Sequence, residues 1–325
     1  MWVPEEGNLN NLFIGTVQLG VLLLDNLSIE VSTAKFSSTT GKVVAASTGS
    51  ETRDDSLIDV GAPDSFRFRS RFIEAQTASG NINGSWPLYN YLEMQSNSGY
   101  VKVNIEPKEQ DIDAPGPAIL YIHSISGNLE FCEPIRRAVS QALAHQAQGM
   151  ADLRAETVLP PRDYRVNVHS VSGNIRGAAA FSSICSFKCT SGMMVLDVLP
   201  ILDSSLAEKV TLQTSGTSGN TYLTVLDPLW VERGNYIDLA PAARALRNLH
   251  SDHSSTSADI RLRFPAIWRG DVTMSAMLGN LRARGEGLRV IQGSGWPELY
   301  ARTIEGGGSK TTVYVVSGNV DFTLE

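Results

Sequence analysis

The stretch YRVNVHSVSGNIRG, residues 164–177, decides how the chain folds. Apolar Val166 and Val168 alternate with polar residues until the chain reaches Ser172-Gly173-Asn174, and Ile175 then resumes the pattern. Strict alternation over six or more residues indicates a strand with one buried face. Glycine and asparagine tolerate positive φ angles. We therefore interpret the Gly-Asn pair as a corner between two strands, although a two-residue hairpin turn would also accept it.

The same phrase recurs along nearly the whole chain, in ten copies. Its corner glycines are Gly41, Gly80, Gly99, Gly127, Gly173, Gly192, Gly219, Gly279 and Gly318, and Ala258 replaces glycine in the weakest copy. Asparagine follows the glycine in six copies, at Asn81, Asn128, Asn174, Asn220, Asn280 and Asn319. A hairpin fold would not need one tripeptide so many times, so the repetition favours corners.

The spacing of the copies indicates a stacked solenoid. Gly80 to Gly99 and Gly173 to Gly192 are each 19 residues apart, and other steps are longer. A period near 20 with inserted loops is typical of coils that stack to share one core. Equivalent residues would then lie about 4.8 Å apart. We expect the corner asparagines to form side-chain amide ladders.

The solenoid is predicted to occupy residues 26–325 as a single domain, preceded by an N-terminal entry or cap over residues 1–25. Two insertions interrupt it, at residues 131–163 and 227–257. Apolar residues at helical spacing after Pro134 predict a short amphipathic helix over residues 134–148.

Two further expectations concern the C-terminal half. We expect a second short helix from Ala242 to Leu249, followed by a polar loop, HSDHSSTS. The last strand, Thr311 to Leu324, has no capping element after it. This favours a truncated chain or a partner that covers an open solenoid end.

Composition limits the classes of partner. The 325 residues are 42% hydrophobic and 19% charged, with a formal charge of −7, which argues against nucleic acid or anionic membrane. The apolar run Val21 to Leu24 is too short for a membrane span or a signal peptide. By default we predict a cytoplasmic protein, or a domain of a longer chain.

The three cysteines are too few for a disulfide framework. Cys185 and Cys189 fall on the predicted inward face beside Phe187, which makes them core residues. Cys132 has no assignment.

Histidines and carboxylates are the candidates for chemistry. His123 and His169 occupy the same outward position in two copies, where a stacked pair could bind a metal, although two exposed histidines are the simpler reading. His250 and His253 lie in the predicted Ser-rich loop and indicate a metal site only weakly. The outward carboxylates, Glu74, Glu93, Glu130 and Asp197, look scattered. We predict no catalytic residue, cofactor or metal.

Repeated phrases of the form Φ-x-Φ-x-S-x-S-G-N-Φ resemble adhesin-like domains of unknown function from bacteria and especially fungi. The resemblance covers roughly residues 25–325 and lies in the repetition, because a single SGN carries almost no information. It implies a right-handed parallel β-solenoid (a single-stranded β-helix), all-β apart from the helical insertion. It brings no catalytic residues.

We therefore expect a non-enzymatic β-solenoid scaffold or adhesin-like binding domain, with a protein or glycan ligand on its surface and self-association through its open ends. The alternatives are a carbohydrate-active β-helix enzyme, either a polysaccharide lyase or a hydrolase, and a carbohydrate-binding module. Clustered carboxylates would favour the enzyme. A row of exposed aromatics would favour the binding module, with Trp86, Tyr89 and Tyr91 as candidates, although packing on the core explains these three more simply.

Overall fold

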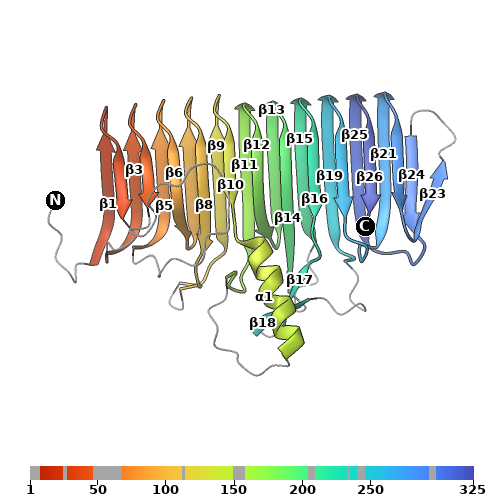
Figure 1. Cartoon of the computed structure of the whole chain (residues 1–325), viewed down its shortest axis with the longest axis horizontal. Helices are drawn as coiled ribbons and strands as arrows, with labels where there is room; N and C mark the ends of the chain where they lie inside the picture. Colours follow the sequence, from red (N-terminus) through yellow and green to blue (C-terminus); the bar gives the residue numbers. More distant parts are fainter. Residues whose placement is uncertain are drawn as a thin grey trace.

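A computed structural model describes residues 8–24, 28–46, 68–111, 114–148, 158–203, 209–232, 235–239, 246–292 and 298–325 of the chain. About two thirds of the described residues are in strands, and one helix is among the rest. The strands form two long, mainly parallel sheets that lie against each other (Figure 1). The parallel β-solenoid expected from the repeats is confirmed at this level.

Sheet A contains the strands before each corner and part of the C-terminal region. Its order is β1 (Asn8–Thr16), β3 (Glu30–Ser38), β5 (Arg69–Thr77), β7 (Tyr91–Ser96), β9 (Ala118–Ser124), β11 (Tyr164–Ser172), β13 (Ile184–Ser191), β15 (Val210–Ser218), β19 (Leu249–Ser257), β25 (Ser309–Ser317), β21 (Gly270–Leu278), β24 (Glu298–Thr303) and β23 (Leu288–Gln292). The pairing is parallel from β1 to β21 and antiparallel from β21 to β23.

Sheet B contains the strands after each corner. Its order is β2 (Val21–Leu24), β4 (Val43–Ala46), β6 (Ile82–Leu88), β8 (Val101–Pro107), β10 (Leu129–Cys132), β12 (Ile175–Phe181), β14 (Met194–Asp203), β16 (Thr221–Val225), β20 (Ile260–Phe264), β26 (Val320–Leu324) and β22 (Leu281–Gly285). The short pair β17 (Leu229–Glu232) and β18 (Asn235–Leu239) lies off this path, on the far end of β14.

The core lies between the two sheets. Alternate residues of each strand point inward, as in β11, where Val166 and Val168 are buried while Arg165 and Asn167 are exposed. Phe131 of β10 and Phe187 of β13 stack across the core with ring centroids 6.3 Å apart. Cys185 and Cys189 are buried beside Phe187, which confirms their inward assignment.

The glycines line up at the corner between the sheets. A Cβ atom at Gly173 would overlap the carbonyl oxygen of Gly127, and one at Gly192 would overlap that of Gly173. The same contact with the adjacent coil recurs for Gly41, Gly80, Gly99, Gly127, Gly219, Gly279 and Gly318, and Gly318 rests on Ala258. Glycine is favoured here because successive main chains touch, although Ala258 occupies the same position in one copy.

The corner hydroxyls and amides bond to the main chain. The buried Ser124 hydroxyl accepts from the Gly127 N–H at 2.8 Å. The Asn128 Oδ1 accepts from the Asn174 N–H of the next coil at 2.9 Å, and the Asn174 Oδ1 accepts likewise from Met193. The predicted amide-to-amide ladder is therefore wrong for these coils, because the side-chain oxygens bind main-chain donors instead. Side-chain amides bond across coils near the C-terminal end, where the Asn280 Nδ2 donates to the Asn319 Oδ1.

The insertion after β10 carries α1 (Ile135–Gln148), which confirms the predicted helix. Ile135, Ala138 and Ala142 are buried, and the helix packs against β12 and β18 below the sheets (Figure 1). No helix in the described part of the chain is long and apolar enough to span a membrane.

Two segments differ from expectation. Residues 8–24 are not an irregular cap: β1 and β2 pair in parallel with β3 and β4 and form the first coil. The predicted loop HSDHSSTS is strand β19, paired with β15 and β25. The helix expected from Ala242 falls mostly outside the described residues, but Leu249, its expected end, begins β19.

The C-terminal strands were expected at an open end, and this is wrong. β25 lies between β19 and β21, and β26 lies between β20 and β22 (Figure 1). The last strands of the sequence are therefore internal in both sheets. β23 and β22 form the sheet edges at this end of the molecule.

Candidate functional site

The outward face of sheet A gathers polar and aromatic side chains into columns. Its strands pair in register, so one outward position of each coil lies directly beside the same position of the next. Two areas of this face could bind a ligand, and they lie on different strands.

The first area, which we call the aromatic–acidic patch, consists of Phe72 and Glu74 on β5, Tyr91 and Glu93 on β7, and Tyr121 on β9. Phe72 is 43% exposed, and its ring centroid lies 6.4 Å from that of Tyr91. Glu74 is the direct cross-strand partner of Glu93, which in turn is beside Tyr121. The patch thus combines apolar ring surface with two carboxylates.

Each carboxylate of the patch is bound to a neighbouring side chain. The Lys35 ammonium contacts the Glu74 Oε1 at 2.8 Å, and the Tyr91 hydroxyl donates to the Glu93 Oε2 at 2.8 Å. Gln76 and Gln95 donate to the same two carboxylates. Burial, followed by the bond to Glu93, raises the pKa of Tyr91, so its hydroxyl remains a donor at neutral pH.

The carboxylates are thus less scattered than the sequence indicated. Glu74 and Glu93 stand on adjacent strands, about 4.8 Å apart at the main chain. Glu130 and Asp197 lie on the other sheet, where each contacts one basic residue, Lys102 and Arg136 respectively. Two neighbouring carboxyl groups are also what a retaining glycosidase uses.

His123 and His169 lie between the two areas, on β9 and β11. Their rings stack in parallel, with centroids 5.0 Å apart and planes within 2°. A metal that bridged the two rings would need one nitrogen of each within about 4.2 Å of the other, because each zinc–nitrogen bond is about 2.1 Å. The ring centroids are farther apart than that, so this stacked arrangement does not favour a bridging metal. Burial, then the charges of His123 and Lys188, lowers the pKa of His169, which favours its neutral ring. Among the described residues no group of three or more His, Cys, Asp or Glu side chains could hold a metal ion.

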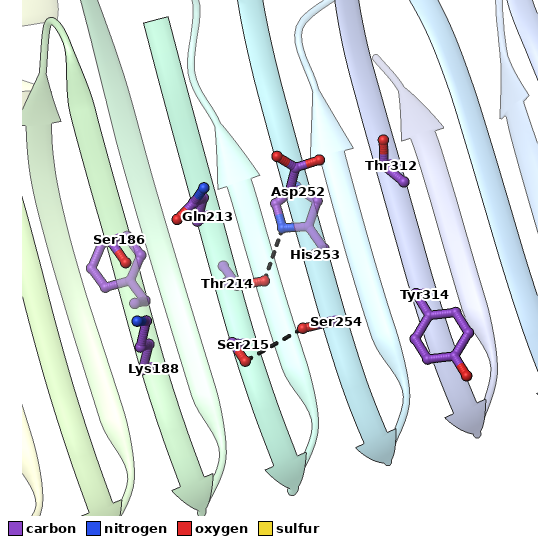
Figure 2. A pocket seen from close by; sticks show the side chains of 11 residues that line it. Ser186, Lys188, Gln213, Thr214, Ser215, Asp252, His253, Ser254, Thr312 and Tyr314 are labelled. Carbon is purple, nitrogen blue, oxygen red and sulfur yellow. Dashed lines mark hydrogen bonds between the residues drawn. The ribbon is translucent and has the colours of Figure 1, made fainter.

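The second area is a hollow of about 250 Å³ over β13, β15, β19 and β25, which we call the hydroxyl hollow (Figure 2). Ser215 and Ser254 line it, and their hydroxyls are 3.3 Å apart. Larger side chains stand around these small ones, namely Lys188, Gln213, Asp252 and Tyr314. The hollow exists because Ser215 and Ser254 are small, whereas the same column carries the long side chains of Lys188 and Tyr314 on the strands to either side.

His250 and His253 cannot share a metal, because they point to opposite faces of β19. His250 is outward, whereas His253 is 2% exposed in the core. The His253 Nδ1 bonds to the Thr214 hydroxyl at 2.8 Å, and its Nε2 has no partner among the described residues. Burial lowers the pKa of His253 to about 3, so the ring is neutral.

A buried carboxyl group was missed by sequence reasoning. Glu133, beside the start of α1, is 1% exposed, and its Oε2 accepts from the Ala180 N–H at 2.7 Å. Burial raises its pKa to about 8, against a smaller opposing effect of that hydrogen bond. The group is therefore mainly protonated at neutral pH. Nothing in the local sequence around Glu133 and Pro134 marks this carboxyl group as buried.

The aromatic candidates divide between core and surface. Trp86 is fully buried and packs against Phe36, with ring centroids 6.2 Å apart, as the core interpretation predicted. Packing on the core was the wrong interpretation for Tyr91, which lies on the outward face of β7, in the patch. Burial raises the pKa of Tyr89 to about 12. Phe72 and Tyr121, which complete the patch, could have been found by extending the outward alternation to the neighbouring copies.

No family model, curated protein or solved structure matches this chain. The resemblance to adhesin-like domains therefore stays a prediction, and the site must be interpreted from its own geometry.

Proposed function

We propose that the protein is a non-enzymatic, right-handed β-solenoid scaffold, adhesin-like in character, that binds a glycan along the outward face of sheet A. The right hand follows the strong preference of crossovers between parallel strands. The observation that carries the binding proposal is the aromatic–acidic patch. Sugar rings stack on aromatic faces, and planar carboxylates and amides hydrogen-bond their hydroxyls.

The hydroxyl hollow supports the same function. It offers Asp252 and Gln213 as hydrogen-bonding groups and Tyr314, 46% exposed, as an aromatic surface. A polymer that extends along the columns would contact both areas of one face.

A glycan array, followed by titration calorimetry on the best ligand, tests the proposal. Tyr91→Ala combined with Tyr121→Ala should weaken binding about tenfold or more, because each aromatic contact contributes about 0.5–1.5 kcal/mol. Tyr314→Ala tests the hollow separately. Tyr100→Ala is the matched control, since Tyr100 is 43% exposed but follows the corner glycine Gly99 instead of lying on this face. Equal affinity in the double variant and in this control would refute the assignment.

The adjacent Glu74 and Glu93 favour one alternative, a retaining glycoside hydrolase. The distinguishing measurement is release of reducing ends from the bound polysaccharide by wild type and by Glu93→Gln. We expect no release from either protein. If the wild type releases reducing ends and Glu93→Gln does not, the protein is a glycoside hydrolase and the scaffold proposal is wrong.

A further inference from the structure

The C-terminal coil lies out of sequence order. In the earlier part of the solenoid each coil stacks on the coil that precedes it in the chain. Residues 309–325, which contain β25 and β26, instead enter between β19/β20 and β21/β22 (Figure 1). We call the space that they fill the strand slot.

The segment in this slot connects the last strands of the molecule to the rest of the solenoid. Within the described residues, β21 pairs only with β25 and β24, and β22 pairs only with β26. The unit formed by β21 to β24 is therefore joined to the other coils in both sheets through residues 309–325.

The segment that fills the slot is attached by a short glycine linker. Thr303 ends β24 and Ser309 begins β25, with Gly306-Gly307-Gly308 between them. Gly306 has a φ of +66°, and the space around it is open. Six residue steps can span about 20 Å, which is enough to reach a neighbouring molecule at close contact.

The strand slot makes specific side-chain contacts with residues 309–325, so it favours this sequence over an unrelated strand. The buried Thr311 hydroxyl bonds to that of Ser251 at 2.8 Å, and the Ser309 hydroxyl donates to the Leu246 carbonyl at 2.9 Å. Asn319 is bound from both sides, since its Nδ2 donates to the Asp259 Oδ1 at 3.0 Å and its Oδ1 accepts from the Asn280 N–H at 3.0 Å.

Packing and charge add to this selectivity. Phe322 packs against both Phe264 and Trp268, with ring centroids 5.1 Å and 5.6 Å away. Asp321 lies between Arg261 and Arg282 as their cross-strand partner. An unrelated strand would leave the arginines and the buried hydroxyls without these partners.

We propose that the strand slot also accepts residues 309–325 of a second copy of this chain, so that molecules associate by exchanging their C-terminal coil. An exchanged segment makes the same contacts as the intramolecular one. The linker and the protein concentration therefore decide which form is populated.

Disulfide trapping in the full chain tests the exchange. Ser275 and Tyr314 are direct partners on β21 and β25, with side chains on the outward face. Ser275→Cys and Tyr314→Cys are prepared as separate proteins, both with Cys132→Ser, then mixed, unfolded, refolded and oxidised. Exchange yields a covalent heterodimer on a non-reducing gel. The matched control pairs Ser215→Cys with Ser254→Cys, neighbours on β15 and β19 that lie outside the exchanging segment.

The linker provides the second arm. Thr303 and Ser309 flank Gly270 on opposite sides, about two strand spacings (roughly 9.6 Å) apart. Deletion of residues 304–308 leaves a single residue step of about 3.8 Å between them. This deletion should prevent a chain from filling its own slot and should raise the dimer fraction at least about tenfold, measured by light scattering after size exclusion. A single chain with both Ser275→Cys and Tyr314→Cys reports, by its internal disulfide, that the slot forms. If that disulfide forms while the mixed proteins give no more heterodimer than the control, the proposal fails. A folded, monomeric deletion variant would also overturn it.

Discussion

His253 is a basic side chain that the core holds in its neutral form. Its ring lies among buried residues, and Thr214 is its one hydrogen-bond partner within the described part of the chain. The protonated ring would have to leave water for an apolar environment, which accounts for the low pKa of His253. The histidine thus makes the fold sensitive to acid.

Acid should weaken the fold through this residue. The pKa of His253 is about 3 in the folded chain and near 6.5 when unfolded, so the unfolded state binds more protons between these values. The neutral His253 ring makes its full contribution to the free energy of unfolding above pH 6.5. As the pH falls below 6.5, the free energy of unfolding decreases by up to about 1.4 kcal/mol per pH unit. Urea unfolding of wild type and His253→Asn between pH 4.5 and 7.5 measures it.

The difference in unfolding free energy between wild type and His253→Asn should shrink as the pH falls through this range. His250→Asn, on the exposed face of the same strand, is the control and should show a smaller pH dependence. A constant difference for His253→Asn would contradict a buried neutral ring. Glu133 acts in the opposite direction, since its raised pKa removes stability as the pH rises from about 4.5 to 8.

The sequence predicted which residues form the corners, but not the physical reason why glycine occupies them. The repeat pointed to glycine at position 173, for which we expected a positive φ. Gly219 has one, at +110°, whereas Gly173 is not in the left-handed region. Glycine occupies position 173 because a Cβ atom there would overlap the main chain of the adjacent coil at Gly127. These two residues are 46 positions apart, so a local sequence pattern does not reveal the contact.

At the scale of elements, β19 shows why a polar segment was mistaken for a loop. Its inward residues are Leu249, Ser251, His253 and Ser255, which alternate with period two but are mostly polar. Hydroxyl partners on neighbouring strands, such as Thr311 for Ser251, replace apolar contacts. The pattern was present, but its partners come from distant coils, so composition alone indicated a loop. α1 was predictable because its apolar spacing is local.

Strand β26 separates two strands that carry like charges. Arg261 and Arg263 project from β20, and Arg282 and Arg284 from β22. Asp321 on β26 is placed between them and bonds to Arg284 at 3.1 Å. Direct pairing of β20 with β22 would bring arginines side by side, which is unfavourable. Charge thus helps to direct the C-terminal coil into its slot.

Asp321→Asn should therefore destabilise the protein by about 1 kcal/mol, with a larger loss at low salt, where the arginines are less screened. Urea unfolding at 20 mM and at 500 mM salt measures the effect. The Debye length is about 21 Å at the lower salt, over four times the coil spacing of about 4.8 Å, and about 4 Å at the higher salt, slightly less than that spacing. Asp197→Asn is the matched control, because Asp197 also lies on sheet B and contacts a single arginine at 3.1 Å. Equal losses and equal salt dependence for the two variants would show that the arginine cluster plays no part.

For the whole molecule, the repeats indicated the solenoid but not the order of its coils. Any copy with a matching corner could stack on any other, because the copies share one pattern. The position of β25 and β26 depends on pairings such as Asn319 with Asp259, 60 residues apart. The candidate glycan face was likewise only partly predictable, since Glu74 and Glu93 become neighbours through register between coils.

The most direct test of the stacked corner is the unfolding free energy of Gly173→Ala compared with Gly216→Ala. A Cβ atom at Gly173 would overlap the Gly127 carbonyl, whereas one at Gly216 would meet its nearest neighbour at an ordinary 3.6 Å. We predict a loss of about 2–3 kcal/mol for Gly173→Ala and a change within about 0.5 kcal/mol for Gly216→Ala. Equal stability of the two variants would contradict a solenoid whose coils touch through a column of glycines.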